Sequence, residues 1–529
     1  MNSERFYLRQ NVQLEPLVNQ WYAWPHLVAP ATAAMNIANS HVKIMKSYIM
    51  APQVHAAAVK NPAMRGGPFL DLDGNRVNDI KRLLDITLKE QACMIELAKS
   101  IKELNELVLN EAKGYSLEGL YEKIPENLRG YTELTYDINN NSSIRFIEAL
   151  LYRSRYYDKS HQSLALSLAR QDGRSFVFST PRLNDEGLLH LPIVFDDPAI
   201  DELFKMHSMR QPFGYIKEML GIEEGDETLF RSFLTEEAPP AAEVYDNGSI
   251  RIRYFGHACI QLESNGITLL TDPVISYKYD GAVPRLTYAD LPSSIDYVLL
   301  THTHSDHVVF ETLLQLRHRI KTIIVPRSGG GALEDPSLKL VLKNIGFKNV
   351  VELDEMESLE IEGGSITGIP FLGEHGDLVI RSKMAHLIRL GNKTVMCAAD
   401  SCNLDTRLYK HVHDITGDID VLFLGMECDG APMSWLYGAL LMRPLERKMD
   451  HSRRLCGSDC ERGMAIIDEL NCKQVYVYAM GQEPWLSFLT SIKYTDESKP
   501  IVESNKLLEA CRNRGIGAER LYGMKEMLV

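Results

Sequence analysis

Apolar residues recur at near-helical spacing over a long stretch in the first half of the chain. The positions are Ile80, Leu84, Leu88, Ile95, Ile101, Leu104 and Val108. This spacing predicts one amphipathic helix, which Asn78 can cap and Gly114 can end. The apolar face of such a helix needs a partner surface. That surface is either the rest of the chain or a second copy of it, so a homodimer is one prediction.

The remainder of the first half mixes helical and strand-like patterns. Residues 31–49 and 144–152 favour helices, and residues 130–137 alternate like a strand. Residues 176–179 and 189–195 look like a strand pair joined by a polar turn. We therefore expect an α+β region here. An acidic stretch ends in two prolines at residue 240, and we place the boundary between two domains, 1–245 and 246–529, just after it.

The second half consists mainly of short apolar runs between turn residues, a pattern typical of buried strands. The runs are residues 267–271, 297–301, 322–326, 349–353, 358–361, 365–371, 386–390, 394–398, 421–424 and 474–478. Ile250, Ile252 and Tyr254 alternate with Arg251 and Arg253, which predicts a half-buried strand. Helical patterns at 310–319 and 336–345 complete an α/β arrangement of two sheets covered by helices.

One apolar run, residues 297–300, ends in four potential metal ligands. They are His302, His304, Asp306 and His307. In an extended chain His302 and His304 point to the same side, because they are two residues apart. A turn after Ser305 would let the other two ligands face the same space. One metal ion could then take the alternating histidines and a second could take Asp306 and His307.

The composition sets limits on the class of function. Apolar residues make up 45% and charged residues 24% of the 529 positions, as in ordinary soluble globular proteins. The formal net charge of −14 argues against a nucleic-acid partner. Nine scattered cysteines favour a reducing compartment without a disulfide framework. Because the sequence has no pattern of a signal peptide or a membrane span, we expect a cytoplasmic protein with no membrane partner.

The ligand motif resembles the second motif of the metallo-β-lactamase superfamily. Leu269-Leu-Thr-Asp-Pro273 resembles its first motif, and Ala398-Ala-Asp400 resembles the segment whose aspartate bridges two metals. The resemblance runs from about residue 248 to the end of the chain and implies a C-terminal αββα sandwich. His257 follows a strand and a glycine, and it is either structural or near the metals.

Two departures from the superfamily pattern change the expected ligands. Where the superfamily carries the third histidine of the first site, this chain has Phe371-Leu-Gly-Glu-His-Gly-Asp377. The final histidine of the superfamily has no counterpart in residues 475–482. Glu374 can take the third position, and His375 is the competing ligand. Asp400 can be shared by the two metals. The sites are then His302, His304 and Glu374 for one metal, and Asp306, His307 and Asp400 for the other. Two histidines and a carboxylate are typical of non-haem iron(II) oxygenases, although zinc accepts carboxylates as well.

Over its full length the chain resembles the metallo-β-lactamase-fold di-iron aminoacyl β-hydroxylases, a family known from chloramphenicol biosynthesis. The resemblance implies a bridged pair of Fe ions, O2 as co-substrate and an external electron donor. It also implies hydroxylation at the β-carbon of an aminoacyl thioester on a carrier domain of a nonribosomal peptide synthetase, with an aromatic amino acid such as p-aminophenylalanine. The catalytic carboxylates are then Glu374, Asp400 and Glu427, of which Glu427 is either a carboxylate behind the ligands or a surface loop acid. The alternatives are a dizinc hydrolase and a metal-free structural relative.

A basic segment is a candidate docking surface for the carrier domain. Residues 443–454 hold Arg443, Arg447, Lys448, Arg453 and Arg454 in an otherwise acidic protein. Carrier domains are usually acidic, so a local positive surface favours their approach. The alternative is a solvated charged helix face.

Overall fold

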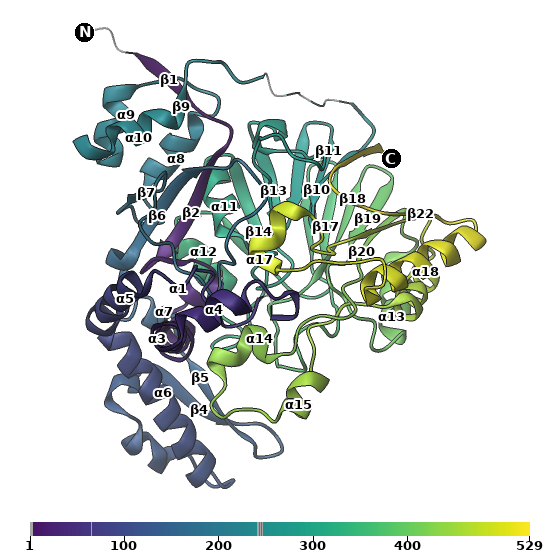
Figure 1. The fold of residues 1–529 in the computed structure, drawn as a ribbon. Helices are drawn as coiled ribbons and strands as arrows, with labels where there is room; N and C mark the ends of the chain where they lie inside the picture. Colours follow the sequence, from purple (N-terminus) through teal and green to yellow (C-terminus); the bar gives the residue numbers. More distant parts are fainter. Residues whose placement is uncertain (1–3, 65, 241–242, 244, 246) are drawn as a thin grey trace.

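Two seven-stranded sheets form the centre of the C-terminal region, shown in teal, green and yellow in Figure 1. The first sheet consists, in spatial order, of β15 (Val350–Leu353), β14 (Ile320–Pro326), β13 (Ile295–Leu299), β12 (Ile267–Thr271), β11 (Cys259–Ser264), β10 (Arg251–Gly256) and β23 (Lys525–Leu528). The second consists of β16 (Ser358–Ile361), β17 (Gly364–Ile369), β18 (Ala385–Leu390), β19 (Lys393–Cys397), β20 (Val421–Gly425), β21 (Gln474–Tyr478) and β22 (Gly517–Arg520). The computed structural model describes residues 4–64, 66–240, 243, 245 and 247–529, so residue 246, where we start the second domain, lies outside the described residues.

Helices cover the outer faces of both sheets. The first sheet carries α11 (Phe310–Leu316) and α12 (Leu338–Asn344), and the second carries α13 (Arg407–Thr416), α16 (Cys460–Glu469) and α18 (Lys499–Asn513). Between the sheets, Ile252 and Leu299 of one sheet lie in the same buried cluster as Val395 and Phe423 of the other. This order of layers confirms the αββα sandwich.

Strand β10 is not half-buried as predicted, because both of its faces are covered. Arg251 and Arg253 are 2% and 4% exposed. Arg251 donates a hydrogen bond to Glu263 over 2.9 Å, and Arg253 donates one to Gln261 over the same distance. Partners on the neighbouring strand β11 thus compensate the burial of these two charges, which alternation alone does not predict.

The N-terminal region is α+β, as predicted, and its elements appear at the left of Figure 1. Its strands are β1 (Arg5–Leu8), β2 (Val12–Val18), β3 (Trp21–Tyr22), β4 (Thr132–Tyr136), β5 (Ser142–Phe146), β6 (Gln162–Leu168), β7 (Leu189–Leu191), β8 (Gln211–Pro212) and β9 (Leu234–Thr235). Its helices are α1 (Pro25–Val28), α2 (Pro30–Asn36), a π-helical turn η1 (Ile37–His41), α3 (Val42–Met50), α4 (Pro52–Ala58), α5 (Val77–Glu90), α6 (Ala92–Glu111), α7 (Glu148–Leu151), α8 (Pro198–Lys205), α9 (Phe213–Leu220) and α10 (Glu227–Ser232). Residues 144–152, predicted as one helix, contain the end of β5 and the short α7, and β7 pairs with β6 rather than with residues 176–179.

The predicted helix from Asn78 to Gly114 is two helices, α5 and α6, separated at Gln91. Asn78 is not the cap, since α5 starts one residue earlier. Of the predicted apolar face, Leu88 is 41% exposed. Five other positions, Ile80, Leu84, Ile101, Leu104 and Val108, are buried in one cluster with residues of α2 and α3. The chain itself therefore covers most of this face.

The two regions share their hydrophobic cores. One buried cluster contains Leu14 and Phe204 of the N-terminal region together with Val298 and Leu313 of the first sheet and α11. The second region also holds the short helices α14 (Ser434–Tyr437), α15 (Arg447–Ser452) and α17 (Ser487–Thr490). In Figure 1, α14 and α17 lie close to α4, and α15 lies further from it. Within the described residues, no helix is long and apolar enough to cross a membrane.

Candidate metal centre

The predicted ligands lie in loops that follow strands of both sheets. Asp272 follows β12, and the segment from His302 to His307 follows β13. Glu374 lies between β17 and β18, Asp400 follows β19 and Glu427 follows β20. Because β12 and β13 are parallel neighbours, and so are β19 and β20, their carboxyl ends bring these loops together at one end of the sandwich.

The segment from His302 to His307 has the turn that the sequence predicts. The His307 backbone N–H donates a hydrogen bond to the carbonyl of His304 over 3.2 Å. The ring of His302 lies 4.7 Å from that of His304 and 4.1 Å from that of His307, measured between centroids. All three imidazoles therefore face one space.

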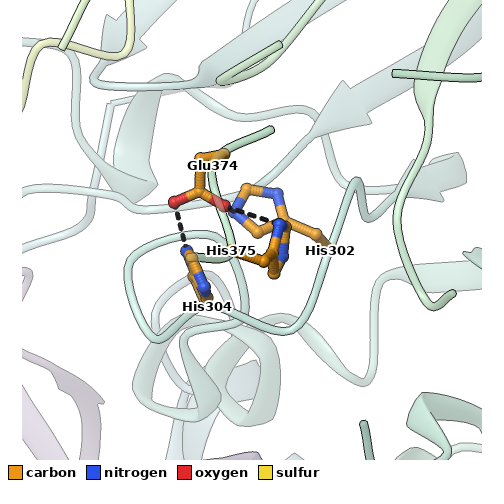
Figure 2. A group of neighbouring side chains, drawn as sticks. All are labelled: His302, His304, Glu374 and His375. Atoms are coloured by element: carbon orange, nitrogen blue, oxygen red, sulfur yellow. Dashed lines mark ion pairs between the residues drawn. The ribbon is translucent and has the colours of Figure 1, made fainter. Parts of the chain in front are cut away.

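Glu374 lies among the histidines, with its carboxylate directed at their rings (Figure 2). Its Oε1 is 2.7 Å from His304 Nδ1, and its Oε2 is 3.7 Å from His302 Nε2. The residue has a φ of +67°, a left-handed conformation that is unusual for glutamate. Burial raises the pKa of Glu374 to about 7, although the nearby His304 lowers it. A cation in this space would favour the ionised form of the carboxylate.

His375, the competing ligand, lies in the same group. Its Nδ1 is 3.0 Å from Glu374 Oε2 and forms a hydrogen bond with the carbonyl of Gly373 over 3.2 Å. Burial, with a further contribution from His304, holds the pKa of His375 well below its ordinary value, so the ring is neutral. Both Glu374 and His375 are therefore placed to bind a metal, and the choice between them stays a prediction.

The second group is built around His307. Its Nε2 lies 3.0 Å from Asp400 Oδ2, and its Nδ1 lies 2.8 Å from Asp272 Oδ2. The hydroxyl of Thr301 donates a hydrogen bond to the same Asp272 oxygen over 2.6 Å and fixes that carboxylate. Burial alone would lower the pKa of His307, but Asp400 and Asp272 outweigh it and raise the pKa well above the ordinary value.

Asp306 points towards His257, the histidine that the sequence left undecided. Their closest atoms, Asp306 Oδ2 and His257 Nε2, are 3.2 Å apart. Burial would raise the pKa of Asp306, but His307 and His257 outweigh it and lower the pKa below its ordinary value. The structure thus places His257 beside the candidate ligands rather than in a separate structural role.

The donor atoms of both groups fit metal ions. Several of these buried atoms have no hydrogen-bond partner within the described part of the chain, which is costly for a polar group unless a cation or water satisfies it. They are His302 Nε2, Glu374 Oε2, His375 Nε2, Asp400 Oδ1 and both ring nitrogens of His257. Burial and the neighbouring His307 keep the pKa of His302 well below its ordinary value, so its ring retains a lone pair for a metal. Three sets of these side chains converge closely enough to hold an ion: His302, His304, Glu374 and His375; His257, Asp306 and His307; and His302, His307 and Asp400.

A cavity of about 250 Å³ opens onto both groups. His304, Asp306, Glu374 and Asp400 line it together with Glu427. The side chain of Glu427 is half-buried, so the description as a surface loop acid does not apply. Burial raises the pKa of Glu427 well above its ordinary value, and the charges of Asp400 and Asp306 act in the same direction.

One neighbour of the site was missed in the sequence. Tyr437, in α14, places its hydroxyl 3.0 Å from His304 Nε2, on the side of the ring opposite Glu374. Its burial raises the pKa of the phenol well above its ordinary value, so the hydroxyl stays neutral. No local motif marks Tyr437, because the contact joins residues 133 positions apart.

Comparisons with known proteins agree with this geometry. Residues 7–239 match the family described as diiron non-heme beta-hydroxylase N-terminal domain, and residues 251–427 match the beta-lactamase superfamily domain. The chain is 38% identical over 98% of both sequences to the 4-amino-L-phenylalanyl-[CmlP-peptidyl-carrier-protein] 3-hydroxylase of Streptomyces venezuelae. It superposes on the crystal structure of CmlA, a diiron beta-hydroxylase of the same organism, with a TM-score of 0.94, 36% identity and complete coverage of both chains. A UPF0173 metal-dependent hydrolase of Methanopyrus kandleri is 28% identical over only 23% of this chain and 46% of its own length.

Proposed function

Because this chain belongs to the family of di-iron non-haem β-hydroxylases, we propose that it hydroxylates the β-carbon of an aminoacyl group held as a thioester on a nonribosomal peptide synthetase carrier domain. The observation that carries this proposal is the 38% identity over nearly the full length to an aminophenylalanyl-carrier hydroxylase. The same relative supports an aromatic substrate such as p-aminophenylalanine. The enzyme is a di-iron monooxygenase and uses O2.

We propose that the ligands predicted from the sequence hold the iron pair. His302, His304 and Glu374 would hold one iron, and Asp306, His307 and Asp400 would hold the other, with Asp400 shared. Asp400 supports this assignment because its Oδ2 lies 3.0 Å from His307 Nε2 and 3.9 Å from His302 Nε2, between the groups. Glu427 lies in the cavity beside them as a further carboxylate. Three histidines and three carboxylates suit iron, whereas the dizinc hydrolase is not favoured by the full-length match.

The reaction needs two electrons from outside the protein. Insertion of one oxygen atom into the β-carbon C–H bond reduces the other atom of O2 to water, and this consumes two electrons and two protons. When bound, the iron pair would supply the activation of oxygen and the redox chemistry. The chain supplies a recessed cavity that orients the substrate, and its buried carboxylates hold the charge of the cations. An external electron donor therefore remains part of the proposal.

Three further features of the proposal concern the surroundings of the enzyme. A groove between η1 and α6, with Ala38, Ile95 and Ala98 in its lining and charged residues such as Lys99 and Glu103 beside them, is the candidate surface for a homodimer. All nine cysteines are free, which supports a cytoplasmic location. The two-domain division at residue 245 is supported by the separate matches of the two families.

The carrier domain would dock on the exposed part of the basic segment. Arg447 and Lys448 in α15 are exposed. Arg443 is already paired with Glu106 at 2.7 Å, Arg454 with Asp429 at 3.2 Å, and Arg453 donates to the carbonyl of Gly376 over 2.8 Å. Among the described residues, Arg447 and Lys448 have no such partner, so these two charges are free to meet an acidic protein.

The experiment that tests the function combines metal analysis with mass spectrometry. The purified protein should contain two irons per chain, and the reduced enzyme should add 16 Da, about one oxygen atom, to an aminoacyl group on its carrier in the presence of O2. Stoichiometric zinc, with no hydroxylation after iron loading, would show that the protein is a hydrolase-like relative instead.

A further inference from the structure

A second cavity adjoins the metal cavity at the seam between the two regions. It has a volume of about 240 Å³. In the N-terminal region its walls come from residues 59, 64, 66, 67, 69 and 71 and from residues 174, 176 and 179, and in the C-terminal region from Ser487 of α17 and Ser491, which follows that helix. Gly66 and Ser491 line both cavities, so the two spaces meet at these residues. In Figure 1 this place lies where α4, α14 and α17 approach one another.

At the junction between the cavities, the backbone at Gly66 lies close to the side chains of Trp435 and Ser491. The indole N–H of Trp435 donates a hydrogen bond to the carbonyl of Gly66 over 2.9 Å. Gly66 has a φ of +67°, and a Cβ at this position would lie 3.2 Å from both Ser491 Cβ and Trp435 Nε1. A larger residue would therefore be strained and would narrow the passage, which a glycine keeps open.

The lining of the second cavity suits a slender ligand that carries polar groups but no negative charge. The hydroxyl groups of Ser487 and Ser491 lie in it with the apolar side chains of Val59 and Phe176, and Asp71 adds a carboxylate. The hydroxyl of Ser179 also lines the cavity but already donates a hydrogen bond to the carbonyl of Phe69. Arg174 also reaches this cavity, but its guanidinium already binds Glu15 at 2.6 Å and Glu311 at 2.8 Å. The cavity thus offers hydrogen-bonding groups and apolar contacts without a free positive charge from Arg174.

We propose that this second cavity binds the pantetheine part of the carrier domain's phosphopantetheine arm. The arm would pass Gly66 and Ser491 and deliver the aminoacyl thioester to the metal cavity. Pantetheine is a thin chain with two amides, a hydroxyl and two methyl groups, which matches the mixed lining. Its phosphate stays outside with the carrier, since the cavity has no unpaired cation among its described lining residues. The inference rests on the proposed function, because it assumes a carrier-bound substrate.

The test compares the binding of two forms of the carrier domain, with and without the arm. The parent enzyme should bind the arm-bearing form more tightly, and calorimetry measures this without turnover. Ser487→Trp fills the cavity from a half-buried position at the start of α17. It should reduce the preference for the arm from roughly tenfold to less than about twofold, because the arm loses its site. Ser487→Ala, at the same position, should keep the preference of the parent.

A second variant guards against misfolding at Ser487. Val59→Trp enters the same cavity from the opposite region and should also remove the preference, while Ser208→Trp on an exposed surface should not. Iron content and thermal unfolding verify that each variant is folded. A Ser487→Trp enzyme that keeps the full preference, or a parent that has none, overturns the proposal. A parent that prefers the arm but hydroxylates no aminoacyl carrier would instead refute the proposed function and leave the arm site standing.

Discussion

Arg174 of the N-terminal region binds Glu311 of helix α11 in the C-terminal region, with 2.8 Å between Nη2 and Oε2. The two side chains are 14% and 4% exposed. Tyr22 and Tyr277 donate further hydrogen bonds to the Glu311 carboxylate, over 3.0 and 2.8 Å. The pair therefore joins the two regions inside the protein, where an unpartnered charge is costly.

Replacing Glu311 with alanine should destabilise both regions together. The change leaves the guanidinium of Arg174 with one buried partner fewer, and we expect a loss of about 3–5 kcal/mol in the free energy of unfolding. Denaturant unfolding, followed by circular dichroism, measures this loss. As a control, Lys321→Ala breaks the exposed pair with Asp296 and should cost less than about 1 kcal/mol. Equal losses in the two variants would contradict the prediction.

Glu374→His should shift the site towards a zinc-type ligand set. The variant restores the third histidine of the superfamily pattern and removes a carboxylate, so we expect zinc to displace iron and hydroxylation to fall by roughly 10–100-fold or more. Metal quantification and mass analysis of the carrier give the two readouts. His375→Ala serves as the companion variant, because only a ligand role for His375 would make it equally damaging. Full hydroxylation by Glu374→His would exclude Glu374 as a ligand.

Tyr437→Phe should weaken iron binding without unfolding the protein. The hydroxyl that orients His304 is lost, and removal of such a partner typically costs about 10-fold or more in metal affinity. Competition with a chelator measures the affinity, and the optical spectrum of the iron pair should change with it. Tyr476→Phe, in strand β21, is a matched control. An unchanged affinity and spectrum would mean that Tyr437 only packs against the ring.

The protein should lose stability as the pH falls from about 6.5, the ordinary pKa of histidine. Burial lowers the pKa of His41 to about 3, so its folded-state pKa lies below its unfolded value. Above its unfolded-state pKa, such a group makes its full contribution to the free energy of unfolding. This contribution is lost as the pH falls towards about 3, at roughly 1.4 kcal/mol per pH unit. His41→Phe keeps the stacking on Trp21, whose ring lies 3.9 Å away, but should flatten the pH dependence of unfolding. Parallel pH profiles of unfolding for the parent and His41→Phe would refute this prediction.

Reversing the charges of Arg447 and Lys448 should impair docking of the carrier domain. With both changed to glutamate, turnover of the carrier-bound substrate should fall several-fold while iron content stays constant. The effect should weaken with salt, since charges are screened over about 8 Å at physiological ionic strength. Lys81→Glu with Arg82→Glu, an exposed pair on α5, is the matched control. Equal turnover in both double variants would move the docking surface elsewhere.

The sequence predicted those parts of the site that are local. His302, His304, Asp306 and His307 lie on one turn, so their spacing alone predicts that they share a space. Contacts between distant segments were not predictable in this way. Tyr437 reaches His304 only through the packing of α14, and the unpredicted edge strands β22 and β23 are short and half-exposed, so they lack an apolar pattern. The long helix was predicted as one element because the interruption at Gln91 leaves the apolar spacing nearly intact.

The distribution of the ligands over both sheets affects how much of the enzyme a cell can accumulate. The turn from His302 to His307 belongs to one sheet and Glu374 and Asp400 to the other, so the full ligand set exists only in the folded chain. Binding to the folded chain alone would then stabilise it by mass action. Chains that mature without iron would keep Glu374 and Asp400 buried without a cation, and quality-control proteases would remove more of them. During iron starvation, the abundance of the enzyme should therefore decline.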